Sequence, residues 1–232
     1  MRLLNALKTD IIFQYRQGFY WIYLLITLVY MTIMSKLPEG NIKAVGVMLA
    51  VFSDPSMLGF FFIGGIVMLE KVQGVIKYLG VTPVYAWEYL LAKALSLSLV
   101  SLAAGSLITK VTYKGEVRFG LLLLGILLSS VFFTLYGFLI AAWARTINQY
   151  FIKMVPFMVL IALPCFSFLL KEQSVLFDLF PSVAGLRLIQ GAFFGIPSSR
   201  ALLNVFILLV ETGIILILAK DTYIKMLVSE EE

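Results

Sequence analysis

The chain has 232 residues, of which 61% are hydrophobic and 13% charged, and it carries a formal net charge of +5. Soluble domains contain about 45–50% apolar and about 25% charged residues, so this composition excludes a soluble globular protein. The apolar runs are long and do not alternate with polar residues. This pattern favours transmembrane helices over a transmembrane barrel and predicts an all-α integral membrane protein with no separate soluble domain.

Several functions are excluded by missing residues. The sequence contains no His and a single Cys, and we find no nucleophile–base arrangement or pair of carboxylates at useful spacing. Gly120 and Gly125 have the glycine spacing of a phosphate loop, but Ile126 and Leu127 stand where Lys and Ser or Thr are needed. We therefore expect no catalytic residue, metal site or bound cofactor in this chain, and the absence of a basic cluster argues against nucleic-acid binding.

Residues 2–17 have the pattern of an amphipathic helix. The apolar side of its helical wheel contains Leu3, Leu4, Leu7, Ile11 and Tyr15, and the polar side contains Arg2, Asn5, Thr9, Arg16 and Gln17. Such a helix is suited to the membrane interface. The alternative is the first part of a signal peptide, but no small-residue cleavage site follows. We expect an interfacial helix over residues 1–18 and a single transmembrane domain over residues 19–232.

Six apolar runs predict six spans. They cover residues 19–34, 44–69, 87–108, 120–144, 150–170 and 201–219. We expect Pro55 to interrupt the second span and Pro156 and Pro164 to bend the fifth. An even number of spans places both termini on one side, and the distribution of the 18 Lys and Arg residues slightly favours the cytoplasm for that side.

The connection over residues 171–200 contains too many Phe and Leu residues for a solvated loop. A short helix after Pro181 that dips into the interface or re-enters the membrane is the expected structure.

The most polar interruption between spans covers residues 70–93. Glu70, Lys71 and Lys77 favour contact with water, Gly80 is suited to ending a helix, and Thr82 and Pro83 are suited to starting the next one. This pattern predicts a short helix over residues 70–79 outside the membrane, followed by a sharp return into it. An ordinary loop between two spans is the alternative.

Residues 70–79, 81–83 and 88–93 together resemble the signature of type-2 ABC transporter permeases. Residues 54–56, 59–64 and 4–20 are similar in particular to the permeases of fluoroquinolone exporters. The resemblance implies an N-terminal elbow helix, six spans, and re-entrant or interfacial helices before the last span, with both termini in the cytoplasm. It also implies a plasma-membrane location and a cytosolic coupling helix between spans two and three.

The same resemblance implies partners. A separate cytosolic ATPase would bind ATP and Mg, and a second permease would complete a homodimer or heterodimer. The implied ATPase-coupling residues are Glu70, Lys71, Gln73, Gly74, Lys77, Thr82 and Pro83.

Asn204 and Glu211 lie about two helical turns apart on nearly the same face of the last span. A charged acid at that depth is costly, so the Glu211 side chain should face the bundle interior, a dimer interface or a wet cavity. Both residues are candidates for the substrate path, although a protonated Glu211 holding neighbouring helices together is an equal alternative.

The sequence thus favours the permease subunit of an ATP-driven exporter of a lipophilic or amphiphilic compound. An ion-coupled secondary transporter and a membrane scaffold without transport activity are the alternatives.

Overall fold

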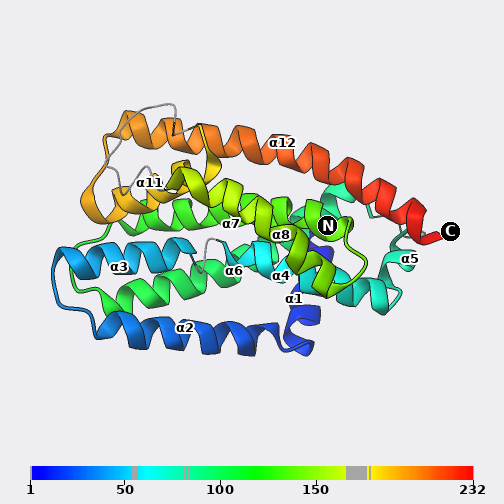
Figure 1. The fold of residues 1–232 in the computed structure, drawn as a ribbon, viewed down its shortest axis with the longest axis horizontal. Helices are drawn as coiled ribbons and strands as arrows, with labels where there is room; N and C mark the ends of the chain where they lie inside the picture. Colours follow the sequence, from blue (N-terminus) through cyan, green and yellow to red (C-terminus); the bar gives the residue numbers. More distant parts are fainter. Residues whose placement is uncertain are drawn as a thin grey trace.

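The computed structural model describes residues 2–53, 57–80, 82, 84–165, 177 and 179–231, and every regular element in this part of the chain is a helix. The helices form an elongated bundle (Figure 1). In chain order they are α1 (Arg2–Arg16), α2 (Phe19–Ser35), α3 (Asn41–Val51), α4 (Leu58–Val72), α5 (Val75–Gly80), α6 (Ala86–Thr112), α7 (Phe119–Ala142), α8 (Ile147–Ala162), a 3-10 turn at Leu163–Cys165, α11 (Pro181–Phe194) and α12 (Ser198–Glu231). The all-α prediction is confirmed.

Three helices are long and apolar enough to cross a membrane, namely α6, α7 and α12. The bent pair α1 and α2 adds a fourth candidate if it is counted as one span. By length and composition, the described residues therefore contain three or four candidate spans where the sequence predicts six.

The difference arises because two predicted spans are divided or short. The predicted second span consists of α3 and α4, with 11 and 15 residues, and Figure 1 shows these two helices in line. Pro55, the expected cause of the interruption, lies outside the described residues. The predicted fifth span begins with the 16 residues of α8, which contain Pro156, and continues into the 3-10 turn around Pro164; residues 166–170 lie outside the described part.

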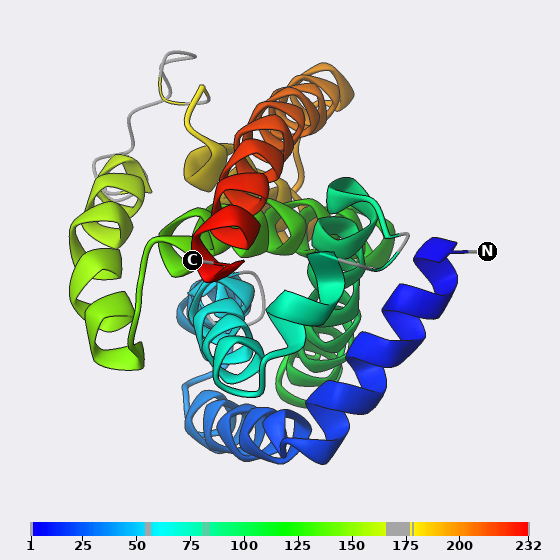
Figure 2. The same ribbon diagram turned by 90° about the vertical axis from the view of Figure 1, so that its right-hand side faces the viewer.

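Helix α1 turns sharply away from the bundle axis. It meets α2 at 70°, and Gly18 at the junction has φ +80, a conformation that glycine adopts without steric cost. Figure 2 shows α1 crossing the end of the bundle, and α1 packs on α6. Asp10 and Gln14 are buried on this side, so part of the polar surface of α1 faces protein.

Helix α7 is central, since it packs against α4, α6, α11 and α12. Small residues bring α4 and α7 close together. A methyl group on Gly137 would come within 2.8 Å of the Phe60 carbonyl oxygen, and one on Gly59 would overlap the Thr134 hydroxyl. These two helices therefore form a closely packed pair with little room for rearrangement.

Helix α11 runs antiparallel to the first half of α7. The backbone N–H of Arg118, at the start of α7, donates to the Ala192 carbonyl at 3.0 Å. Further along, Gly125 faces Leu188, and Ser129 faces Gly185. Most of α11 is buried, and Pro181 occupies its first turn. The expectation of a packed helix in place of a solvated loop is confirmed for these residues.

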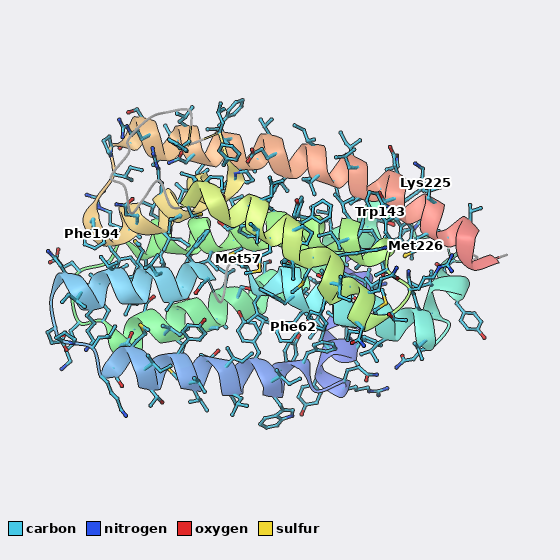
Figure 3. The ribbon with its side chains drawn as sticks, viewed as in Figure 1. Met57, Phe62, Trp143, Phe194, Lys225 and Met226 are labelled. Atoms are coloured by element: carbon cyan, nitrogen blue, oxygen red, sulfur yellow. The ribbon has the colours of Figure 1, made fainter. Side chains whose placement is uncertain are left out.

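The two ends of the bundle differ. Both chain termini, α1 and α5 lie toward one end, here called the terminal end (Figures 1 and 2). Figure 3 places Trp143, Lys225 and Met226 toward this end and Phe194 at the opposite one. The connections between α2 and α3, α6 and α7, and α11 and α12 also lie at the opposite end (Figure 1).

Candidate functional site

The segment predicted as one helix over residues 70–79 is divided in the structure. Helix α4 continues through Glu70 and Lys71 to Val72, and Gln73 and Gly74 form a turn before α5. Gly74 has φ +70 and donates its N–H to the Lys71 carbonyl at 3.1 Å. A left-handed glycine after the last helical turn is a common helix end, so the prediction of a continuous helix is wrong for this local reason.

The residues of this segment point in two directions. Gln73 is exposed, and next to the turn Val72 and Tyr78 are 86% and 72% exposed. Glu70 is only 4% exposed. The expectation that its carboxylate contacts water is therefore wrong. A partner that docks here can reach Val72, Gln73 and Tyr78 but not the Glu70 carboxylate.

Lys71 also turns toward the bundle. Its ammonium donates to the Ala142 and Ala144 carbonyls at 3.1 and 3.0 Å. These carbonyls belong to the last turn of α7 and the residues after it, where helical carbonyls lack intrahelical partners. Lys71 therefore caps α7 and fastens the end of α4 to it.

The return into the bundle begins later than predicted. Helix α6 starts at Ala86, where the Glu88 carboxylate accepts a hydrogen bond from the Tyr85 N–H at 3.0 Å. Thr82 is exposed and precedes the helix by several residues, so its predicted capping role is wrong. Pro83 and the side chain of Lys77, which belongs to α5, lie outside the described residues.

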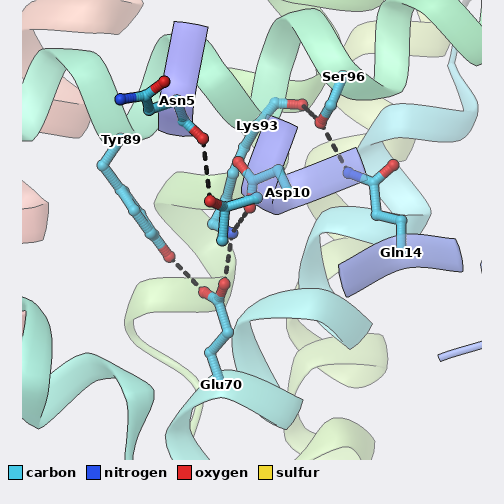
Figure 4. A network of polar contacts seen from close by, with 8 residues as sticks. Asn5, Asp10, Gln14, Glu70, Tyr89, Lys93 and Ser96 are labelled. Carbon is cyan, nitrogen blue, oxygen red and sulfur yellow. Dashed lines mark hydrogen bonds and ion pairs between the residues drawn. The ribbon is translucent and has the colours of Figure 1, made fainter. Parts of the chain in front are cut away.

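A buried ion cluster includes Glu70, which precedes the turn by three residues (Figure 4). The Lys93 ammonium of α6 lies 2.6 Å from a Glu70 carboxylate oxygen on α4 and 2.9 Å from an Asp10 carboxylate oxygen on α1. The Tyr89 hydroxyl donates to the second Glu70 oxygen at 2.6 Å. Lys93 is 1% exposed. Three helices thus meet at one ammonium group.

Neighbouring contacts extend the ion cluster. The Gln14 amide of α1 donates to the Ser96 hydroxyl of α6 at 2.7 Å, and the Ser96 hydroxyl donates to the Lys93 carbonyl at 2.9 Å. The Tyr89 ring stacks on Tyr223 of α12 with centroids 4.7 Å apart. The ion cluster and these contacts therefore join α1, α4, α6 and α12.

The buried charges constrain the positions of the side chains in the ion cluster. Removing charges from water is costly, and the mutual attraction of the ions and their hydrogen bonds offsets that cost only when the geometry is good. Loss of the Lys93 charge would leave two carboxylates together in the interior. Among the described residues no group of three His, Cys, Asp or Glu side chains could hold a metal ion.

The sequence reasoning missed Asp10 and Lys93 as site residues. Asp10 and Lys93 are 83 residues apart, and no local pattern relates them. One signal was available, because Lys93 is a lone cation at the edge of an apolar run, where a charged residue needs a partner.

The candidate substrate-path residues lie on α12. Asn204 is fully buried, and neither polar atom of its amide has a hydrogen-bond partner in the described part of the chain. Glu211 is half-buried, and its Oε2 is buried without such a partner there. Glu211 is not part of the ion cluster, so the two sites are separate.

The fold and its apolar helices define an all-helical integral membrane protein with an exposed turn at one end and a buried ion cluster behind that turn. The model of the fluoroquinolones export permease protein family matches residues 1–231, and the chain belongs to this family. The chain is 26% identical over 193 residues to the fluoroquinolones export permease proteins of two Mycobacterium tuberculosis strains, CDC 1551 / Oshkosh and H37Rv. The match covers 83% of this chain and 81% of each relative.

Proposed function

We propose that this chain is the permease subunit of an ATP-driven exporter, and that a separate cytosolic ATPase supplies the energy. In this proposal ATP and Mg bind to the ATPase, and this chain catalyses no reaction and holds no cofactor. A second permease, identical or related, completes the transporter.

The observation that carries the proposal is the Gln73–Gly74 turn. It lies at the terminal end, between α4 and the candidate span α6, with Val72 and Tyr78 exposed beside it. These exposed side chains are accessible to a partner protein that docks on the turn. Behind the turn, Lys71 and Glu70 are tied to α7 and α6, so a force applied there acts on the helices of the bundle.

The proposed membrane arrangement has six spans. They are α2, α3 with α4, α6, α7, α8 with the residues that follow it, and α12. About 20 helical residues cross the hydrocarbon region, which α3 and α4 reach only together. Both termini and α5 lie toward the same end, which we assign to the cytoplasmic side of the plasma membrane. In this arrangement α1 is the elbow helix in the interface and α11 re-enters from the outer side.

The substrate is proposed to be a lipophilic or amphiphilic compound of the fluoroquinolone type. The support is the name of the M. tuberculosis relatives and membership of their family. Asn204 and Glu211 are the polar residues of α12 that are proposed to line its path.

The test is reconstitution with a cytosolic ABC ATPase from the same organism. We expect the two proteins to co-purify, ATP turnover to need the ATPase, and a fluorescent fluoroquinolone to accumulate in inside-out vesicles only when ATP is present. A protonophore, which collapses the proton gradient, distinguishes an ATP-driven exporter from an ion-coupled transporter. Transport that needs an ion gradient and continues without ATPase or ATP would overturn the proposal, as would ATP hydrolysis by this chain alone.

A further inference from the structure

The ion cluster lies very close to the turn that we assign to ATPase contact. Glu70 precedes Gln73 by three residues, which corresponds to roughly 4.5 Å along a helix. On α1, Asp10 and Gln14 both face α6 and are buried, and they contact Lys93 and Ser96. The N-terminal helix and the end of α4 are thus held on the same two turns of α6.

We propose that Lys93 is a positioning residue for energy coupling, which holds α1 and the end of α4 on α6 so that the three segments move as one unit. The proposal rests on the proposed function. A displacement of the Gln73–Gly74 turn by the ATPase would then move α1 as well, and α1 would transmit motion in addition to lying in the interface.

The geometry supports a rigid connection. Lys93 makes two close ion pairs with carboxylates from different helices, and its ammonium also lies 4.6 Å from the centre of the Tyr89 ring. Because these groups are buried, solvent and salt screen their attraction weakly. Separating α1 from α4 would expose one carboxylate to the interior without its counter-ion, which disfavours independent movement.

The connection continues to the last helix. Tyr89 donates to Glu70 and stacks on Tyr223, and Tyr223 lies on α12, the continuous helix that also carries Glu211 and Asn204. Rigid secondary elements are among the structures that carry coupling between distant sites. The ion cluster therefore links the turn at the terminal end to the helix that carries the substrate-path candidates.

The first test removes the charges together. In a Cys165→Ala background, Asp10→Asn, Glu70→Gln and Lys93→Met leave no unpaired charge in the interior. We expect this variant to bind the ATPase and to hydrolyse ATP at the parent rate, while transport per ATP falls by about tenfold, within the range of measured site-to-site couplings. A purely structural role would not change this ratio in a properly assembled transporter.

A milder variant keeps the test decisive if the triple variant fails to fold. Tyr89→Phe removes one hydrogen bond to Glu70 and retains the ring beside Tyr223. We expect about a fivefold loss of transport per ATP, at the lower end of such couplings. The matched control is Ser101→Ala, which removes a buried hydroxyl contact between α6 and α7 at 3.1 Å outside the cluster and should leave the ratio unchanged.

Either variant can overturn the inference. An unchanged ratio of transport to ATP hydrolysis in Tyr89→Phe, or in a triple variant that assembles, would do so. Absence of ATP-driven transport in the parent would instead overturn the proposed function.

Discussion

The ammonium nitrogen of Lys93 lies 2.6 Å from a carboxylate oxygen of Glu70, and both side chains are buried although their helices are separated by the exposed Gln73–Gly74 turn. The pair holds the end of α4 on the start of α6, so the two helices that flank the turn are fastened behind it. Asp10 adds α1 to the same contact.

We expect Lys93→Met alone to be more destabilising than the neutral triple variant. The single change leaves Asp10 and Glu70 buried without a counter-ion, which costs about 3–5 kcal/mol of the free energy of unfolding. The triple change with Asp10→Asn and Glu70→Gln removes this repulsion and should cost less. Denaturant titration of the purified chain in detergent measures both. A single variant as stable as the parent would show that the cluster contributes no net stability.

Gly74 should tolerate few replacements because of its left-handed backbone. Gly74→Ala places a Cβ at φ +70, which costs about 1–2 kcal/mol, whereas Gly74→Asn should cost less because Asn enters this region more readily. We expect Gly74→Leu to fold and to lose transport per ATP, because it reshapes the turn. Gly120→Ala is the control, since Gly120 is exposed with open space around it.

Accessibility of single cysteines tests the proposed orientation. In a Cys165→Ala background, we expect a membrane-impermeant thiol reagent to label Gln73→Cys in inside-out vesicles only. Glu116→Cys, which is exposed on the connection at the opposite end, should be labelled in intact cells only. Each cysteine is tested in both preparations and serves as the control for the other, and the reverse pattern would invert the proposed topology.

Glu211→Gln separates a charged role from a structural one, because it keeps the hydrogen-bonding shape and removes the charge. If Glu211 contacts a cationic or zwitterionic substrate, transport of that substrate should fall by about tenfold, because a charged hydrogen bond becomes a weaker neutral one. Transport of a neutral substrate should not change. Glu116→Gln is the matched control. Normal transport of cationic substrates by an assembled Glu211→Gln transporter would leave the residue a structural role.

Local sequence signals located the helices but not all of their ends. The prediction of a helix after Pro181 is confirmed in α11, because proline in the first turn and a dense apolar composition are local features. The helix start at Thr82 and Pro83 was wrong, because Glu88 instead caps the backbone at Tyr85. The break between α4 and α5 at Gln73–Gly74 was also not predicted, because it depends on the backbone conformation of Gly74, which composition does not specify.

The candidate site was predicted only in part. The segment around Gln73 and Gly74 was located from its polarity, and these residues do lie at an exposed turn. Glu70 and Lys71 were expected to face water for the same reason, yet both turn inward. Their partners, Lys93 and the carbonyls of Ala142 and Ala144, are brought close only by helix packing.

The sequence by itself determined that this is an all-helical membrane protein with apolar helices and a polar interruption near residue 73, because composition and helical periodicity depend on residues close together in the chain. Only the tertiary structure decided that Asp10, Glu70 and Lys93 form one buried cluster. A charged residue in a sequence pattern is equally compatible with water and with a counter-ion. The choice follows from which helices pack together, and close packing of α1, α4 and α6 brings the two carboxylates within hydrogen-bond distance of one ammonium.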